Sequence, residues 1–459
     1  MRNTDAFGKI KNIHFIGIGG ISMSGLAEVL WRGGFNVTGS DDFPSENTKR
    51  LTGLGIPVNI PNAAENIIAS MEMAVFTAAV RTDNPEFIAA KNMGIPLVER
   101  AAFIGMLLKG YEYPVCVSGS HGKTTTTSLI SEVCLGAGLD PTISIGGHMN
   151  RGGMNYRVGE SPYFILEACE YNGSFLHWYP KIGVILNIDA DHLDYFKNIG
   201  NIIEAFDGFA KNIRQDGALV IRTGIPGFDK ITGGLSCKAV TFGLSGARFT
   251  PCDISYSAGL PSFTVKDGDK KTARINLKLL GEYNMLNALA AFAAATELGL
   301  PAETIASALS EARGTKRRFE YKGTYNQAPV YDDYAHHPTE ISSCLAAARG
   351  LCGEETRIIC LFQPHTYSRT KSLFDDFATA FSHADLIIIL PIYAAREPFD
   401  AEISSEMLVE RIKLSGRNAI SMENFADTGK YLRDNACFGD LVLTMGAGDV
   451  HKIGEELLS

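Results

Sequence analysis

Short apolar runs recur along the chain, and each ends in a glycine, a polar or an acidic residue before a stretch with helical spacing begins. The clearest runs are IHFIGIGG, MAVFTAA, PVCVSGS, YFILEACE, GVILNID, RIICLFQPH, LIIILPIY and LVLTMGAGD. This rhythm is typical of α/β proteins. Because the runs are apolar throughout, without alternation, we expect parallel strands covered on both faces, with functional residues just past their C-terminal ends.

Changes in this pattern divide the chain into three predicted domains, residues 1–109, 110–314 and 315–459. A helix-like segment ends at KGYEYP, and the charged link EARGTKRRFE follows an alanine-rich segment. From about Gly217 to Leu280 the pattern is closer to a period of two and contains the turn signals of PSFTVKDGDKKTARINL. We therefore expect antiparallel strands appended to the middle domain.

Composition narrows the class of protein. The 459 residues are about three times a typical ~150-residue domain. A net charge of −9 argues against a nucleic-acid partner, because phosphate neutralisation needs a basic surface. No run approaches the ~20 apolar residues of a membrane span, and the N-terminal segment lacks the apolar core of a signal peptide, so we expect a cytoplasmic protein without membrane insertion. Nine scattered cysteines without a CxxC pair argue against metal cages and disulfides.

The first glycine cluster follows a predicted strand and opens a predicted helix. Its candidate ligand-binding residues are Gly17, Gly19, Gly20, Ser22 and Ser24. Backbone N–H groups of such a turn can approach a diphosphate at a helix N-terminus. Ser22 occupies the place of the third glycine in the dinucleotide fingerprint, so a purely structural turn and a nicotinamide site are both open alternatives.

Ser40 and Asp41 follow the next apolar stretch. A carboxylate at such a strand end can accept hydrogen bonds from a ribose or a base. We therefore include both residues in the same predicted binding site.

The second glycine cluster is more informative, because it lies between the predicted strand PVCV and a helical segment. The loop comprises Gly119, Ser120, His121, Gly122, Lys123, Thr124 and Thr125. Lys123 is expected to neutralise the β and γ phosphates of a nucleotide, and the Thr124 hydroxyl to bind Mg²⁺. Val117 stands where the strict Walker motif has its first glycine, so a chance Gly-Lys-Thr sequence is the alternative.

An acidic residue and a histidine follow two further predicted strands. Glu167 ends the run YFIL, and His192 lies in NIDADHLD after GVIL. Beside a phosphate loop, both are candidate ligands of Mg²⁺. Since hard cations prefer oxygen, the alternative for His192 is a turn histidine hydrogen-bonded to Asp194.

The segments GSHGKTTTT, EACEYNGSF, NIDADHLDYF, GEYNMLNALAA, TKRRFE, DDYAHHPTE, FQPHTYSRT and MGAGDVHK together resemble the Mur ligase family, in its order, from about residue 13 to Lys452. The resemblance implies a Rossmann-like UDP-binding domain, a central P-loop ATPase-like domain and a C-terminal Rossmann-like domain. It also implies a ligase of peptidoglycan precursor synthesis that uses ATP and Mg²⁺ to join L-alanine to UDP-N-acetylmuramate through an acyl phosphate. A monomer or weak homodimer is expected.

The resemblance implies further roles on the nucleotide side. The asparagine pair that reads adenine in the family matches Asn284 and Asn287, for which capping of the following helix is the alternative. Arg318 matches an arginine that contacts the nucleotide phosphates. Asp333 matches a carboxylate near the ribose.

On the substrate side, the resemblance places His336, His337 and Arg369 around the muramoyl carboxylate and the incoming amino acid. A base near His336 or His337 is plausible for the attacking amine. Two positions depart from the family. Thr366 stands where members often carry an arginine, which moves expected substrate contacts to Arg369, and Arg396 stands where many relatives have a glycine-glutamate turn.

Three rival functions share part of these signals. A recycling ligase that attaches a whole peptide to the same sugar would use the same loop and metal ligands. A nicotinamide dehydrogenase would use the first glycine turn but leave Lys123, Glu167 and His192 without a role. A nucleotide-binding regulator would have lost the catalytic ligands, which are intact here.

Overall fold

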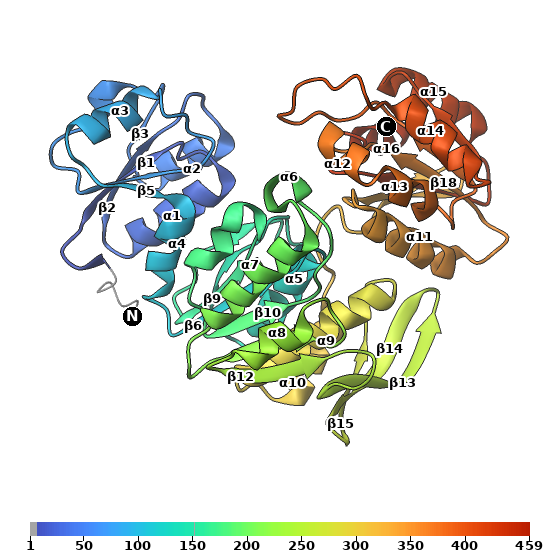
Figure 1. Ribbon diagram of the computed structural model, residues 1–459, viewed down its shortest axis with the longest axis horizontal. Helices are drawn as coiled ribbons and strands as arrows, with labels where there is room; N and C mark the ends of the chain where they lie inside the picture. The colour runs from blue at the N-terminus through green and yellow to red at the C-terminus, as the bar shows by residue number, and fades with distance from the viewer. Residues whose placement is uncertain (1–6, 151) are drawn as a thin grey trace.

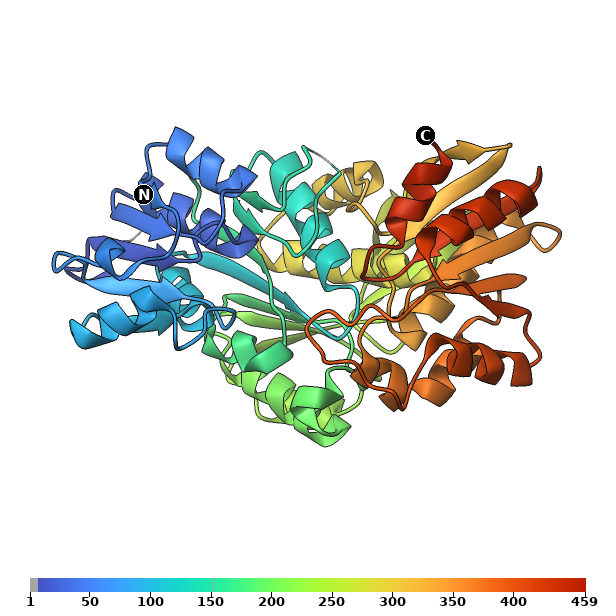
Figure 2. The same ribbon diagram turned by 90° about the horizontal axis from the view of Figure 1, so that it is seen from above.

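The computed structural model describes residues 7–150 and 152–459. Three sheets follow one another along the chain and form three α/β units (Figure 1). Seen from above, the middle unit lies between the N-terminal and C-terminal units (Figure 2). The prediction of a three-domain α/β fold is confirmed.

The N-terminal unit has a five-stranded parallel sheet of order β3-β2-β1-β4-β5. Its strands are β1 (Asn12–Ile16), β2 (Asn36–Ser40), β3 (Val58–Asn59), β4 (Met73–Phe76) and β5 (Leu97–Glu99). Its helices are α1 (Ile21–Arg32), α2 (Glu46–Gly53), α3 (Pro85–Asn92) and α4 (Arg100–Leu108). The strand order reverses between β1 and β4, where α/β sheets open a crevice for ligands, and the first glycine cluster lies there.

The middle unit has a ten-stranded sheet of order β15-β14-β13-β12-β11-β10-β6-β9-β7-β8. Its central strands are parallel: β6 (Tyr113–Ser118), β7 (Thr142–Ser144), β9 (Tyr163–Glu167), β10 (Ile182–Ile185), β11 (Ala218–Arg222) and β12 (Lys238–Phe242). Strands β8 (Tyr156–Arg157), β13 (Phe249–Ser257), β14 (Leu260–Asp267) and β15 (Lys270–Asn276) make antiparallel pairs. The main helices are α5 (Lys123–Gly136), α7 (Ile199–Lys211), α9 (Glu282–Glu297) and α10 (Ala302–Glu311).

The predicted antiparallel region between Gly217 and Leu280 is therefore shorter than expected. Strands β11 and β12 at its start are parallel, and antiparallel pairing begins with β13 and β14. The reason lies in burial, because Ala218–Val220 of β11 are buried within the sheet and continue its parallel part.

The C-terminal unit has a six-stranded sheet of order β16-β17-β21-β18-β19-β20, in which only β16 is antiparallel to its neighbour. The strands are β16 (Glu320–Tyr325), β17 (Ala328–Asp333), β18 (Arg357–Phe362), β19 (Leu386–Ile389), β20 (Ala419–Ser421) and β21 (Asp440–Met445). The helices are α11 (Pro338–Cys352), α12 (Tyr367–Ser372), α13 (Phe374–Ala380), α14 (Ser405–Leu414), α15 (Phe425–Asn435) and α16 (His451–Leu457).

The apolar runs of the sequence form the centres of these sheets. The eight runs correspond to β1, β4, β6, β9, β10, β18, β19 and β21, and each pairs in parallel with its neighbours. None of the described helices is both long and apolar enough to span a bilayer.

The N-terminal and middle units are joined by close apolar packing. One hydrophobic cluster runs from Phe15 in the first sheet to Phe175 and Phe206 of the middle unit. Trp178 Nε1 donates to the Ala101 carbonyl at 2.9 Å. A Cβ added at Gly105 of α4 would lie 2.2 Å from the His177 carbonyl oxygen, so only glycine allows this approach. These two units therefore pack as one body.

Candidate active site

The second glycine cluster forms the loop between β6 and α5. Gly119 and Gly122 have φ values of 140° and 83°, which favour glycine. A Cβ at Gly122 would also lie 2.6 Å from Asn287 Oδ1. The loop backbone is thus held against α9, with its N–H groups at the N-terminus of a 14-residue helix. Such a terminus favours anionic ligands.

Lys123 lies at the first position of α5 and folds back over the loop. Its Nζ donates to the Gly119 carbonyl at 2.6 Å and to Glu170 Oε1 at 3.0 Å. Burial lowers the pKa of Lys123, but the carboxylates of Glu170 and Glu167 outweigh burial and raise the pKa above its ordinary value. The ammonium is therefore a permanent charge, aimed at the loop that would hold phosphates.

Thr124 and Glu167 are brought together as the sequence predicts. The Thr124 hydroxyl donates to Glu167 Oε2 at 3.0 Å, and Gly146 N donates to the same oxygen at 2.7 Å. Glu167 stands at the C-terminal end of β9, beside β6 in the sheet. A hydroxyl and a carboxylate thus meet at the edge of the phosphate loop.

His192 lies near Glu170, the partner of Lys123. Its Nε2 is 3.9 Å from Glu170 Oε1 and 3.7 Å from Asp191 Oδ2, and its ring centroid is 4.9 Å from that of Tyr171. The backbone of His192 has a φ of 53°, in the left-handed region. The side chain of Asp194, its alternative partner, lies outside the described residues. Glu167 and His192 therefore both lie near the Lys123–Glu170 pair.

His121 of the loop links the middle and C-terminal units. Its Nε2 lies 3.0 Å from Asp189 Oδ2, and its Nδ1 lies 3.2 Å from Glu340 Oε1 on α11. The Thr339 hydroxyl donates to Asp189 Oδ2 at 2.7 Å. Burial lowers the pKa of His121, but hydrogen bonds to the two carboxylates raise it to about 9. His121 is thus an imidazolium that donates from both ring nitrogens.

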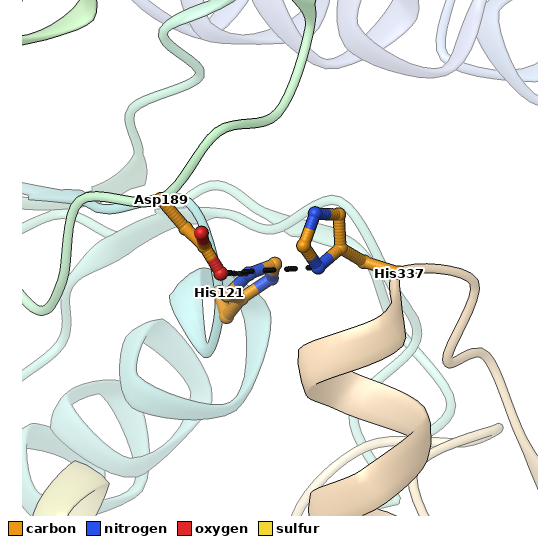
Figure 3. A group of neighbouring side chains, drawn as sticks. All are labelled: His121, Asp189 and His337. Carbon is orange, nitrogen blue, oxygen red and sulfur yellow. Dashed lines mark hydrogen bonds and ion pairs between the residues drawn. The ribbon is translucent and has the colours of Figure 1, made fainter. Parts of the chain in front are cut away.

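His121, Asp189 and His337 come close enough to suggest a metal site (Figure 3). The hydrogen bonds argue for a different role. A metal ligand must present a free nitrogen lone pair, whereas both nitrogens of His121 face carboxylates. His337 Nδ1 already accepts from Thr339 N at 3.3 Å. The cluster is a charged contact between two units.

A cavity between the middle and C-terminal units opens beside the loop. Its lining includes the predicted nucleotide residues His121, Gly122, Thr125, Asn284, Asn287, Arg318 and Asp333. Asn287 Nδ2 donates to Asn284 Oδ1 at 3.1 Å, and Gly281 rather than either asparagine caps α9. Burial raises the pKa of Asp333 to about 6, and its two oxygens accept from Phe319 N and Ala335 N. The structure therefore brings predicted nucleotide residues of both units together in the lining of one cavity.

A second cavity, which we call the N-terminal cavity, lies between the first two units. Gly20 and Ser22 line it together with Arg100, Glu167 and Tyr171. The adjoining turn is fixed by hydrogen bonds, since Gly19 N donates to Asp41 Oδ2 at 2.8 Å.

Two of the predicted substrate residues, Ser24 and Ser40, are buried and do not line this cavity. Ser40 is fully buried and donates to Glu86, and Ser24 is 2% exposed and donates to the Ile21 carbonyl. Gly17 has a φ of 77°, and its backbone N–H donates to the Ser40 carbonyl at 2.9 Å. Contacts of these residues with a ligand stay predictions.

A third cavity, the C-terminal cavity, lies between residues 190–193 and the C-terminal unit. Arg369 lines it and binds Asp191 Oδ1 through Nη2 at 3.0 Å, and its Nη1 lies 3.2 Å from His365 Nδ1. Burial raises the pKa of Asp191, but the positive charge of Arg369 outweighs burial and holds the pKa below its usual range. The Arg369 charge is thus largely balanced before any substrate enters.

His336 and His337 differ in what they can do. Burial lowers the pKa of His336 to about 4, so the ring is neutral at pH 7. Its Nδ1 lies 3.0 Å from the Tyr334 carbonyl, which places the proton on Nδ1 and leaves Nε2 as an acceptor. His337 uses Nδ1 as the side-chain cap of α11. Of the two, His336 suits contact with an amine.

The sequence left two charged residues unassigned. Glu170, 2% exposed, pairs with Lys123, yet in the sequence it is only the second of two glutamates in EACE. Arg100 lines the N-terminal cavity, and its Nε is buried with no hydrogen-bond partner among the residues that the structure describes. The position of Arg100 directly after β5 is the sequence signal that could have identified it as a binding residue.

Three α/β units arranged around a phosphate loop define the class of this protein, and family models confirm it. The model of the Mur ligase family catalytic domain matches residues 12–112, that of the Mur ligase middle domain residues 117–295, and that of the Mur ligase glutamate ligase domain residues 317–448. The chain belongs to the Mur ligase family.

Individual relatives are more specific. The chain is 46% identical over 450 residues to a UDP-N-acetylmuramate–L-alanine ligase of Lachnospira eligens, covering 97% of this chain and 98% of the relative. It is 47% identical to the enzyme of that name from Acetivibrio thermocellus, covering 98% and 96%. The crystal structure of the UDP-N-acetylmuramate–alanine ligase of Thermotoga maritima matches with a TM-score of 0.78 and 30% identity, over 97% of this chain and 98% of that one. A murein peptide ligase of Psychrobacter arcticus shares the fold, with a TM-score of 0.67 and 24% identity over 98% of both chains.

Proposed function

We propose that the protein joins L-alanine to the lactyl carboxylate of UDP-N-acetylmuramate, with conversion of ATP to ADP and phosphate. The observation that carries this proposal is the position of Lys123, Thr124 and Glu167. The Thr124 hydroxyl of the phosphate loop donates to Glu167, which lines the N-terminal cavity, and His121, Gly122 and Thr125 of the same loop line the cavity beside α9. The names of relatives at 46% and 47% identity support the same reaction.

In this proposal each domain binds a different substrate or part of one. Residues 1–109 bind the UDP-sugar at the glycine turn, with Arg100 as the cation for its diphosphate. Residues 110–314 bind the ATP phosphates. Residues 315–459 bind the amino acid and part of the nucleotide through Arg318 and Asp333. Sheets that begin at β1, β6 and β16 support these boundaries. A cytoplasmic monomer or weak homodimer belongs to the same proposal.

Mg²⁺ suits the donors beside the loop. Thr124 and Glu167 place hard oxygen donors 3.0 Å apart, which is the chemistry that this ion prefers. His192 would supply nitrogen to a second position, with Glu170 and Asp191 adjacent. When bound, the ion neutralises charge on the transferring phosphate. Lys123 contributes a fixed positive charge to the same phosphates.

The reaction has two steps. A muramoyl carboxylate oxygen bonds to the γ-phosphorus of ATP while the bond from that phosphorus to ADP breaks. Lys123 and Arg318 stabilise the charge on the phosphoryl group. The neutral amine of alanine then bonds to the acyl carbon, phosphate leaves, and the amine loses a proton. His336 Nε2 is the acceptor that we assign to orient the amine, since a pKa of about 4 makes it a weak base.

The test is phosphate release from ATP in the presence of UDP-N-acetylmuramate and a panel of acceptors: L-alanine, glycine, L-serine and a tripeptide. We expect release with free amino acids, L-alanine above all, and a product mass that corresponds to one amide. Faster turnover with the tripeptide would instead assign a recycling ligase. Absence of release with every acceptor would contradict the proposal.

A further inference from the structure

The N-terminal and C-terminal cavities meet at two side chains, Tyr171 and Arg396, which line both. Among the described residues that line the N-terminal cavity, Arg396 alone comes from the C-terminal unit. It lies in the connection between β19 and α14, an orange-red loop that extends from that unit toward the N-terminal unit in Figure 1. Arg396 thus lies at the junction of the two cavities.

The charges of the C-terminal cavity leave Arg396 without a counterion. Arg369 is neutralised by Asp191, which is 7% exposed. Glu397 accepts from Ser368 N at 3.0 Å and from the Ser368 hydroxyl. By contrast, no residue that the structure describes forms a hydrogen bond or an ion pair with the Arg396 guanidinium. The Arg396 guanidinium is therefore available to bind an anion that enters the C-terminal cavity.

The loop that carries Arg396 is held in place. Thr366 N donates to the Tyr393 carbonyl at 2.8 Å, and Tyr393 N donates to the Pro364 carbonyl at 2.8 Å. Glu397 N donates to the Ala394 carbonyl at 2.9 Å, which closes a turn in which Ala395 has a φ of 54°. This turn is tied to the segment before α12, so the guanidinium is presented from a fixed backbone.

We propose that Arg396 binds the α-carboxylate of the incoming amino acid. This inference rests on the proposed function. Of the reacting groups, the muramoyl carboxylate loses its charge when it is phosphorylated, and the phosphates lie over Lys123. The α-carboxylate stays anionic throughout and enters from the C-terminal cavity. A guanidinium suits it, because its planar donors match the two oxygens of a carboxylate. Thr366 cannot take this role, since it carries no charge and its hydroxyl caps α12.

The experiment compares Arg396→Gln, Arg396→Lys and a matched control, Arg417→Gln, which changes an exposed arginine outside the cavities. We expect Arg396→Gln to raise the KM for L-alanine about 10-fold to 100-fold, the loss expected for a charge-assisted pair. The KM values for ATP and UDP-N-acetylmuramate should change less than about twofold, as should all constants of the control. Lysine should restore part of the loss.

A second readout separates charge recognition from damage to the fold. The wild type should prefer L-alanine strongly over L-alaninamide, which lacks the carboxylate charge, and Arg396→Gln should lose most of that preference. An unchanged KM for L-alanine, or a rise confined to UDP-N-acetylmuramate, would overturn the inference while wild-type turnover with alanine upholds the proposed function. Absence of turnover in the wild type would overturn both.

Discussion

At the scale of single residues, the buried pair of Lys123 and Glu170 is central to both stability and chemistry. Lys123→Met removes the phosphate charge and leaves Glu170, 2% exposed, without its partner. We expect activity to fall by about 10²-fold or more and the free energy of unfolding to fall by roughly 3–5 kcal/mol. Urea unfolding and phosphate release measure the two effects.

The double variant Lys123→Met, Glu170→Gln separates those effects. It leaves no unpaired buried charge, so most of the lost stability should return while activity stays low. If activity returned with stability, Lys123 would have a structural role only.

Glu167 affords a second prediction at this scale. Glu167→Gln keeps the shape of the side chain but removes the charge beside the Thr124 hydroxyl. The Mg²⁺ concentration needed for half-maximal activity should rise about 10-fold or more, because a neutral amide is a weaker ligand of a hard cation. Magnesium titrations of Glu167→Gln and of the surface variant Glu160→Gln would measure this, and identical curves would remove Glu167 from the metal site.

At the scale of elements, helix α4 fixes the N-terminal unit on the middle unit. Gly105→Ala would force a Cβ to within 2.2 Å of the His177 carbonyl, and backbone cannot move aside cheaply. We expect a loss of about 1–3 kcal/mol in unfolding free energy. Gly53→Ala at the end of α2 has open space around its Cβ and serves as the control. It should be neutral or stabilising, and an equal loss in both variants would contradict close packing as the cause.

At the scale of the whole molecule, the C-terminal unit is attached to the rest by charged contacts. His121 bridges Asp189 and Glu340 across this boundary. Its pKa is raised to about 9 in this arrangement. The contact is therefore fully stabilised below the ordinary histidine pKa of about 6.5 and is lost as pH rises through about 9.

This linkage predicts a larger radius of gyration at pH 9.5 than at pH 6.5 in small-angle scattering. Glu340→Gln should weaken the dependence, since it removes the partner on α11. Addition of UDP-N-acetylmuramate and a non-hydrolysable ATP analogue should compact the molecule at either pH, because the substrates bind in different units. A radius independent of both pH and ligands would contradict this opening and closure of the C-terminal unit.

The sequence by itself determined the parallel strands, because continuous apolar runs are stable only where both faces of a strand are covered. It also determined the phosphate loop, because Gly119, Gly122, Lys123 and Thr124 encode a backbone path and a charge locally. Thr124 and Glu167 could be paired from sequence because both follow strands that were expected to share one sheet edge.

Only the tertiary structure decided what depends on contacts between distant segments. In the folded protein Glu170 pairs with Lys123, Ser40 is buried against Glu86, and Asp191 from another unit neutralises Arg369. The sequence assigns these side chains chemical types but no neighbours. Their charges become available or neutralised only when the three units come together. Arg396 could therefore be recognised as a cation without a partner among the described residues only in the folded protein.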